Sequence, residues 1–251
     1  MRKSGLALAL LFAAPVLAKG PPPANVAAAV AGGGRPKAAT DLDEVRRPVE
    51  VLRFLGLRRG DRAADLLAGG GYYSEIMGRA VGPGGSVIAW NNRAGDEKAA
   101  AAWHALSQRV PNAHLMVVPA DRLRLAPSSF DFVLLHMVYH DTYWESTKYN
   151  FARMDPDAFL REVYVGTKPG GIVGVVDHVA NPGGDTRAVV DALHRIDPAV
   201  LRADFERAGF VFDGESNLLR NPADDHSKLV FDPSIRGKTD RVLYRFRKPR
   251  S

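Results

Sequence analysis

Residues able to exchange protons are concentrated between His136 and Asp141, directly after an apolar run. His140 is followed by Asp141, and a histidine beside a carboxylate is typical of an oriented general base. Tyr139 precedes this pair and carries a hydroxyl that can join the same proton transfers. We therefore predict His140, Asp141 and Tyr139 as catalytic residues. The alternative is that His140 only stabilises a long loop by hydrogen bonding.

A second informative stretch, Asp65 to Glu75, contains three consecutive glycines, Gly69 to Gly71. Glycine adopts positive φ easily and lets the backbone approach a ligand closely. An apolar run precedes the glycines and a helical pattern follows them, so the free N–H groups of a helix N-terminus adjoin the turn. This order of elements is typical of a nucleotide site. An ordinary glycine-rich turn is the alternative that this stretch alone leaves open.

The elements that position both stretches alternate between strand and helix patterns. Short apolar runs between turn residues predict strands, and apolar residues at helical spacing predict helices. The alternation predicts an α/β fold with a doubly wound, mostly parallel seven-stranded sheet, and the last two strands, which have no helix between them, predict an antiparallel C-terminal strand. The strands are expected at 62–68, 86–90, 115–118, 129–138 and 172–176, from 209, and at 240–246. The helices are expected at 42–57 and 96–110, from 155, and at 197–208.

The N-terminal residues predict export. A positively charged start precedes an apolar run that ends in Val16-Leu17-Ala18, so residues 1–18 are expected to be a signal peptide. The mature protein is then periplasmic or secreted. Residues 19–40 are rich in Pro, Gly and Ala and are expected to be disordered, which leaves residues 41–251 as the folded domain.

Composition excludes several kinds of chemistry and partner. The chain has no cysteine, so it has neither disulfides nor a cysteine nucleophile. A formal net charge of +6 is too small an excess to predict a nucleic-acid partner. After the signal peptide, no apolar run is long enough for stable membrane insertion. The oligomeric state is left open.

An ordered set of motifs resembles the class I, Rossmann-like S-adenosylmethionine-dependent methyltransferases. Asp65 followed by Gly69 and Gly71 is similar to that family's first motif, although Leu67 stands where its first glycine is usual. Within the family, the chain looks closest to a group of exported predicted methyltransferases of bacteria, which share Gly-Gly-Gly-Tyr-Tyr at 69–73 and Tyr-His-Asp at 139–141. Later signatures of the family are similar to Ala120-Asp121, Phe130-Asp131-Phe132-Val133, Lys168-Pro169-Gly170-Gly171 and Ala208-Gly209-Phe210.

The resemblance implies S-adenosylmethionine as the cofactor and an unidentified small molecule as the methyl acceptor. It also implies that Asp65 lies at the amino-acid end of the cofactor, that Tyr72 lies near the sulfonium and that Asp121 reaches the adenine. The residues that it implies for cofactor binding are Asp65, Gly69, Gly71, Tyr72, Asn91, Asp121 and His136.

Asn91 departs from the family, which usually has an acid there to accept hydrogen bonds from both ribose hydroxyls. A charge-assisted hydrogen bond is roughly twice as strong as a neutral one, so weaker cofactor binding is expected. A non-catalytic module that binds S-adenosylmethionine or a nucleoside is therefore the alternative function. A nicotinamide dehydrogenase is disfavoured because it needs an acid at Asn91 and a glycine at Ser74. No histidine pair has the spacing of a zinc protease, and no metal site is predicted.

Overall fold

The computed structural model describes residues 21–250, so the expected signal peptide, 1–18, lies outside the described residues. The strands are β1 (Arg62–Leu66), β2 (Ser86–Asn91), β3 (Ala113–Val117), β4 (Phe130–His136), β5 (Thr167–His178), β6 (Val211–Glu215) and β7 (Arg241–Arg247). The α-helices are α1 (Val26–Ala31), α2 (Lys37–Thr40), α3 (Asp43–Arg46), α4 (Pro48–Leu55), α5 (Tyr72–Val81), α6 (Glu97–Arg109), α7 (Pro156–Gly166), α8 (Thr186–Leu193) and α9 (Pro198–Arg207). Short 3₁₀ helices are η1 (Ala120–Arg122), η2 (His140–Tyr143) and η3 (Asn217–Leu219).

The seven strands form one sheet in the order β3-β2-β1-β4-β5-β7-β6. Strands β1 to β5 pair in parallel, and β7 runs antiparallel to both of its neighbours. The predicted doubly wound α/β fold with an antiparallel C-terminal strand is therefore confirmed. The order of the strands reverses between β1 and β4, and ligands of such sheets lie beyond the carboxyl ends of the strands at this point.

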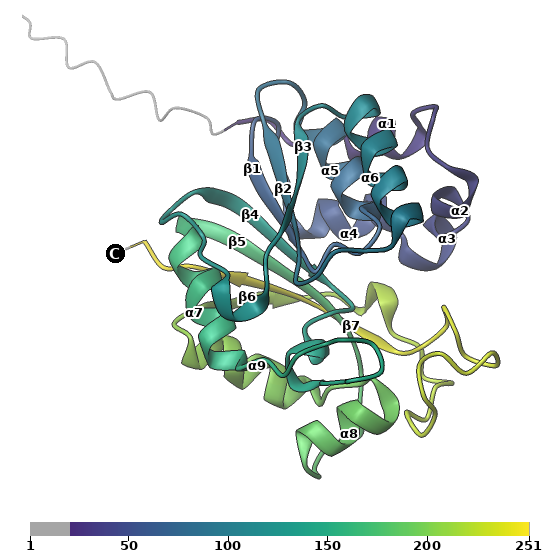
Figure 1. Cartoon of the computed structure of the whole chain (residues 1–251). Helices are drawn as coiled ribbons and strands as arrows, with labels where there is room; N and C mark the ends of the chain where they lie inside the picture. The colour runs from purple at the N-terminus through teal and green to yellow at the C-terminus, as the bar shows by residue number, and fades with distance from the viewer. Residues whose placement is uncertain (1–20, 251) are drawn as a thin grey trace, which may run out of the picture.

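Helices cover both faces of the sheet, and the strands alternate between two apolar cores (Figure 1). Phe132 and Leu134 of β4 point into the core beneath α1, α4, α5 and α6. Val133 and Leu135 of the same strand point into the core beneath α7 and α9. Because both faces are buried, these strands read as continuous apolar runs in the sequence. Within residues 21–250, no helix is both long and apolar enough to span a bilayer.

The expectation of disorder over 19–40 is wrong for the described part of that segment. Asn25 caps α1, whose Val26 and Ala29 are spaced to share one face and are buried against the core. Arg35 then forms a bidentate ion pair with Asp43. The composition of the segment did not predict this helix, because alanine is frequent in low-complexity segments and is also the strongest helix former.

The helical pattern over 42–57 is interrupted. Arg47 adopts a left-handed conformation with φ +47°, and the helix restarts at Pro48 as α4. Proline disfavours helical backbone in the residue before it but suits the first helical position, so the break falls between the two. The short α3 that results places Arg46 beside the carboxyl end of the sheet, where it borders a cavity.

Candidate functional site

Two adjoining cavities lie at the carboxyl ends of β1 and β4, where the strand order reverses. The first, of about 490 Å³, is bordered by Asn91 and Asp141 and is called the Asn91 cavity below. The second, of about 520 Å³, is bordered by Arg46, Tyr72 and His136 and is called the Arg46 cavity. Together they form one cleft, because both are bordered by Leu67, Gly69, Gly70 and Val138.

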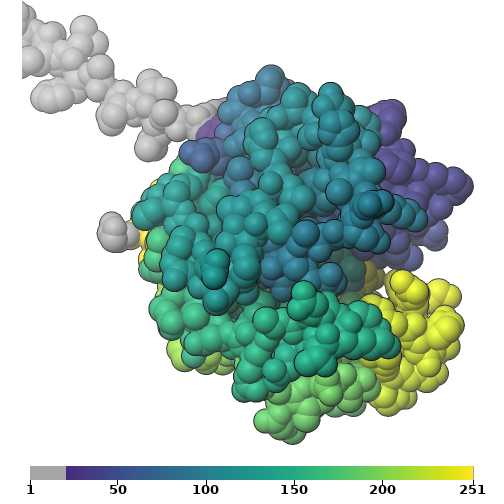
Figure 2. All heavy atoms as spheres, in the orientation of Figure 1, coloured from purple at the N-terminus to yellow at the C-terminus, as the bar shows by residue number. Residues whose placement is uncertain are grey.

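A more open hollow of about 810 Å³ lies between the segment 143–153 and α8. Figure 2 shows this segment in green on the surface, with α8 in lighter green below it and the stretch before β7 in yellow beside it. Phe151 borders both the hollow and the Asn91 cavity. The hollow therefore adjoins the cleft at Phe151.

The glycine turn lies between the cleft and α6. Gly69 and Gly71 have φ of +54° and +81°, so both use the left-handed conformation that glycine tolerates. A Cβ atom on Gly69 or Gly70 would meet nothing within 4 Å, whereas one on Gly71 would lie 2.6 Å from Leu106 and 2.9 Å from Trp103. The first two glycines leave space for a ligand, and Gly71 instead permits close packing on α6.

Leu67 occupies the position where the resembling family usually has its first glycine. Its φ is +55°, a left-handed conformation that glycine adopts without strain and leucine does not. The residue borders both cavities, so it stands where they meet. The turn therefore has a left-handed residue at this position in spite of a side chain that opposes that conformation.

Asn91 is engaged with the glycine turn. Its Oδ1 accepts from the Gly69 amide at 2.9 Å, and its Nδ2 donates to the Gly69 carbonyl at 3.0 Å. The indole of Trp103 donates to the same carbonyl at 2.9 Å. The amide therefore fixes the turn, and one carbonyl oxygen is shared between two donors. A carboxylate at position 91 would lack the donor that this arrangement uses.

Asp65 lies behind the turn and does not border the cleft. Its carboxylate is buried and accepts from the Ser74 hydroxyl at 2.5 Å, which ties the end of β1 to α5. Burial raises the pKa of Asp65 to about 6, although Ser74 and the Arg46 charge oppose the shift. Its effect on a ligand would be through the position of the turn.

The Arg46 cavity offers a cation, a phenol and a neutral imidazole. The Arg46 guanidinium lies 4.5 Å from the centre of the Tyr72 ring, and among the described residues no carboxylate is within ion-pair distance of it. Burial lowers the pKa of His136 well below 6.5, as do the charges of Arg46 and Arg241, so its ring is neutral. Its Nε2 is buried without a hydrogen-bond partner in the part of the chain described.

His140 is held by Asp177 at the end of β5. Its Nδ1 lies 2.6 Å from one carboxylate oxygen, and its backbone amide donates to the other at 2.8 Å. Burial would lower the pKa of His140, but Asp177 and Asp141 outweigh it and raise that pKa to about 9. With no ligand bound, the imidazole is thus charged at neutral pH, which does not suit a free general base.

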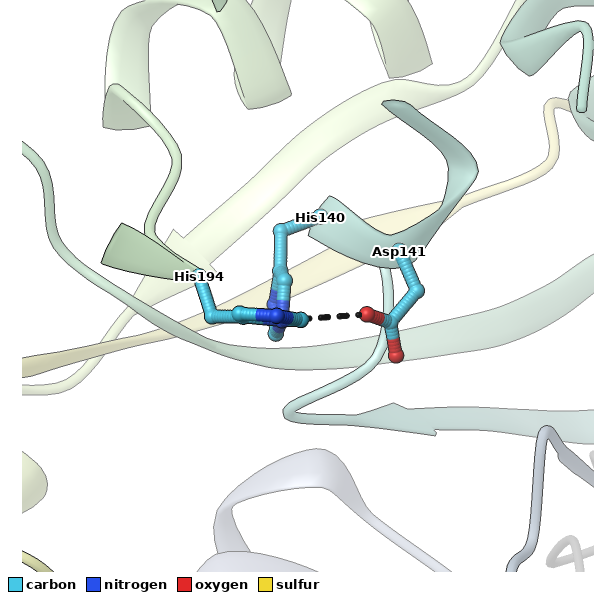
Figure 3. A group of neighbouring side chains, drawn as sticks. All are labelled: His140, Asp141 and His194. Carbon is cyan, nitrogen blue, oxygen red and sulfur yellow. Dashed lines mark ion pairs between the residues drawn. The ribbon is translucent and has the colours of Figure 1, made fainter. Parts of the chain in front are cut away.

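Asp141 borders the Asn91 cavity and faces two histidines. Its Oδ1 lies 3.3 Å from His140 Nε2 and 3.5 Å from Nδ1 of His194, the residue that ends α8. Figure 3 shows both imidazoles directed toward this carboxylate. Of the three predicted catalytic residues, the structure brings His140 and Asp141 together at the cleft.

The third, Tyr139, points into the core. It is fully buried, and its hydroxyl donates to Asp204 of α9 at 2.8 Å. Tyr139 borders neither cavity, so the structure gives it a place in packing. Asp121 lies on η1 at the surface and also borders neither cavity.

Sequence reasoning missed Arg46 and Trp103. Arg46 lies within an amphipathic helical pattern, where a basic residue is usually solvated. It borders the cleft because the left-handed conformation of Arg47 ends α3 directly after it. Trp103 was read as part of an alanine-rich helix. Its position on the same face as Leu106 was the available signal for packing against the glycine turn.

Comparison with protein families matches residues 64–175 to the family described as "Methyltransferase domain". A comparison with curated proteins found no match. Among solved structures, a SAM dependent methyltransferase from Aquifex aeolicus is similar with a TM-score of 0.59 at 18% identity, covering 86% of this chain and 99% of that one.

Two further solved structures have the same fold. An S-adenosylmethionine dependent methyltransferase from Mesorhizobium loti has a TM-score of 0.57 at 18% identity and covers 82% of this chain and 99% of its own. The [4+2]-cyclase SpnF has a TM-score of 0.61 at 17% identity, with 90% and 92% covered. Residues 64–175 thus match a methyltransferase domain, and the fold is one that solved S-adenosylmethionine-dependent methyltransferases share.

Proposed function

We propose that this protein transfers a methyl group from S-adenosylmethionine to a small acceptor in the cleft beyond β1 and β4. The observation that carries the proposal is the cleft itself, which lies at the reversal of strand order and is bordered by the open backbone of Gly69 and Gly70. The family matched by residues 64–175 supports the same reaction class. The acceptor is unidentified.

The residues that border the cleft suit the amino-acid end of this cofactor. Arg46 offers a carboxylate a guanidinium that has no ion-pair partner among the described residues, and guanidinium–carboxylate pairs are among the strongest hydrogen-bonded contacts. Nε2 of His136, which has no hydrogen-bond partner within residues 21–250, offers a further polar contact on the same wall. The Tyr72 ring lies 4.5 Å from the Arg46 guanidinium and helps to hold this cation at the cavity.

The cofactor would supply a methyl group on a good leaving group, so the chain has mainly to orient the reactants. Leu67, Val138 and Phe151 give the Asn91 cavity apolar walls that exclude water from an acceptor. Asp141 and Arg93 are the charged residues that border the same cavity. The cleft therefore suits an acceptor with a flat or apolar body and one polar group.

Gly70 provides a sharp test of the cofactor site. It has no strained φ, and a Cβ atom on it would enter open space between the two cavities, so Gly70→Val fills the cleft without a clash. Gly84, in the turn before β2, has the same properties but borders neither cavity, which makes Gly84→Val a matched control.

Calorimetric titration with S-adenosylmethionine and with its demethylated product measures the outcome. We expect binding to the unaltered protein and to Gly84→Val, and at least a tenfold weaker affinity for Gly70→Val. Equal affinities of both variants would refute the assigned cleft. Transfer of a labelled methyl group to small-molecule extracts then tests the reaction.

A non-catalytic binding module is the second candidate, because the Asn91 side chain is occupied by Gly69 and Leu67 stands between the two cavities. The [4+2]-cyclase SpnF has this fold and is named for a different activity. Binding of S-adenosylmethionine without methyl transfer to any acceptor would favour the module.

We also propose that the protein is exported and belongs with the exported bacterial methyltransferases that its motifs resemble. The proposal depends on residues 1–18. Fractionation of cells that express the whole chain should place the protein outside the cytoplasm, with residues 1–18 removed. Recovery of the uncleaved chain from the cytoplasm would contradict it.

A further inference from the structure

His140, Asp141 and His194 form a cluster of potential metal ligands beside the cleft. One nitrogen or oxygen from each lies within 4.8 Å of the other two. The residues come from η2 and from the end of α8, two segments that are far apart in the chain and adjacent in the fold (Figure 3). Two histidines and one carboxylate are a common ligand set for divalent transition metals in proteins.

The two distances from Asp141 to the histidines match those between ligands of one metal ion. Zinc lies about 2.0–2.1 Å from histidine nitrogens and carboxylate oxygens, so neighbouring ligands at tetrahedral angles lie about 3.3 Å apart. Asp141 Oδ1 lies 3.3 Å from His140 Nε2 and 3.5 Å from His194 Nδ1. Hydrogen bonds from nitrogen to oxygen usually measure about 2.9–3.0 Å, and both contacts are longer.

The surroundings already orient the first histidine. Asp177 is fully buried and holds His140 Nδ1 at 2.6 Å, which leaves Nε2 to face Asp141. Histidines that bind metals almost always donate their other ring nitrogen to a carboxylate or carbonyl in this way. The same Asp177 carboxylate accepts from the His140 backbone amide, so the whole residue is fixed.

The second histidine is also held in place. His194 has φ +50° and ends α8, which turns its side chain back toward η2. The centre of its ring lies 4.8 Å from the ring centre of Trp144 and 5.2 Å from that of Phe231. Its side chain is 12% exposed and that of Asp141 is 21% exposed, so the cluster is shielded without being closed.

We propose that His140 Nε2, the Asp141 carboxylate and His194 Nδ1 bind one divalent transition metal ion, with Zn²⁺ the best fit to this ligand set. Three protein ligands leave a tetrahedral ion one open position, as in catalytic zinc sites. Asp141 borders the Asn91 cavity, so an ion bound there would lie beside the cleft. A metal there would bind an oxygen or nitrogen of the acceptor, and this role, unlike the metal site, rests on the proposed methyl transfer.

The test is titration of chelator-treated, full-length protein with Zn²⁺ in competition with a chromophoric chelator, in the absence of S-adenosylmethionine. We expect one ion per chain. His194→Ala and Asp141→Asn, both at partly exposed positions, should each weaken binding by at least about 100-fold, and Asp177→Asn by about 10–100-fold. His104→Ala, at an exposed position on α6, is the matched control and should bind as the unaltered protein does.

Co²⁺ gives a second readout. A tetrahedral site with two imidazoles should produce visible absorption that is lost in His194→Ala and kept in His104→Ala. Three results would overturn the site: no binding of Zn²⁺, binding of more than one equivalent ion, or an unchanged affinity for Zn²⁺ in His194→Ala, Asp141→Asn and Asp177→Asn. No step of this test uses the cofactor. If Gly70→Val bound S-adenosylmethionine as tightly as Gly84→Val does, the proposed metal site would therefore be unaffected.

Discussion

Replacement of Leu67 by glycine should stabilise the protein relative to replacement by alanine. Leu67 has φ +55°, and a left-handed conformation costs an L-residue about 1–2 kcal/mol. Alanine keeps the Cβ atom and therefore this strain, whereas glycine removes it. Glycine in turn loses about 0.5–1 kcal/mol through the greater freedom of its unfolded chain. Taken at the middle of the two ranges, the difference favours Leu67→Gly by about 0.75 kcal/mol.

The comparison of the two variants isolates the effect of the backbone conformation at position 67 on the free energy of unfolding. Both variants lose the isopropyl group beyond Cβ from the junction of the two cavities, so the packing lost and the space opened are the same except for the Cβ methyl group. Urea unfolding of each variant gives the two free energies of unfolding. A variant Leu67→Ala as stable as Leu67→Gly would refute the strain argument and with it the assignment of the turn.

The same pair of variants tests what the side chain does to a ligand. If the leucine narrows the passage between the Asn91 and Arg46 cavities, both variants should bind S-adenosylmethionine more tightly than the unaltered protein and by similar factors. Weaker binding by both would mean that the leucine is part of the contact surface of the ligand.

Three further predictions concern individual hydrogen bonds. Asn91→Asp should lower the free energy of unfolding by about 0.5–1.5 kcal/mol, because it removes one donor to the Gly69 carbonyl, which keeps the hydrogen bond from Trp103; an unchanged urea midpoint would contradict this. Asp65→Asn should gain stability relative to the unaltered protein as pH rises from 4 to 7. The pKa of Asp65 is about 6 in the folded protein against an ordinary 3.8, so ionisation of Asp65 disfavours the folded state. The unaltered protein therefore loses about 3 kcal/mol of the stability that it has below pH 4 as the pH rises through 6, whereas Asp65→Asn does not. Equal pH profiles from chemical denaturation would refute that shift. Tyr139→Phe should lower stability by about 1–2 kcal/mol through the lost bond to Asp204 and leave affinity for S-adenosylmethionine unchanged, whereas a large loss of affinity by calorimetry would return Tyr139 to the site.

The sequence predicted the sheet well because its signals are local. Each strand of β1 to β5 contains an apolar run that is followed by glycine, proline or a polar residue, and the position of Gly69 to Gly71 after the first run places the cleft. The segment before Thr40 was misjudged because two buried side chains, Val26 and Ala29, decide its order, and composition does not distinguish them from their neighbours.

The site was predicted less well because its contacts join distant segments. The role of Asn91 depends on how closely β2 approaches the glycine turn, and this distance is not encoded in either segment alone. The pairing of Asp141 with His194 depends on α8 folding back over η2. Residue type identified His140 as reactive, but its partner Asp177 could be found only in the folded chain.

Charge orients a zwitterionic ligand in this cleft. The Arg46 cavity presents a guanidinium with no ion-pair partner among the described residues and a neutral His136, so a carboxylate is favoured there. The Asn91 cavity is bordered by Asp141 and Arg93, whose opposite charges offset each other, so it favours a carboxylate less than the Arg46 cavity does. The amino-acid end of S-adenosylmethionine is therefore expected on the Arg46 side and its nucleoside beyond Leu67. Arg46→Gln should then weaken binding of S-adenosylmethionine but not of adenosine, and an equal loss for both ligands would reverse this orientation.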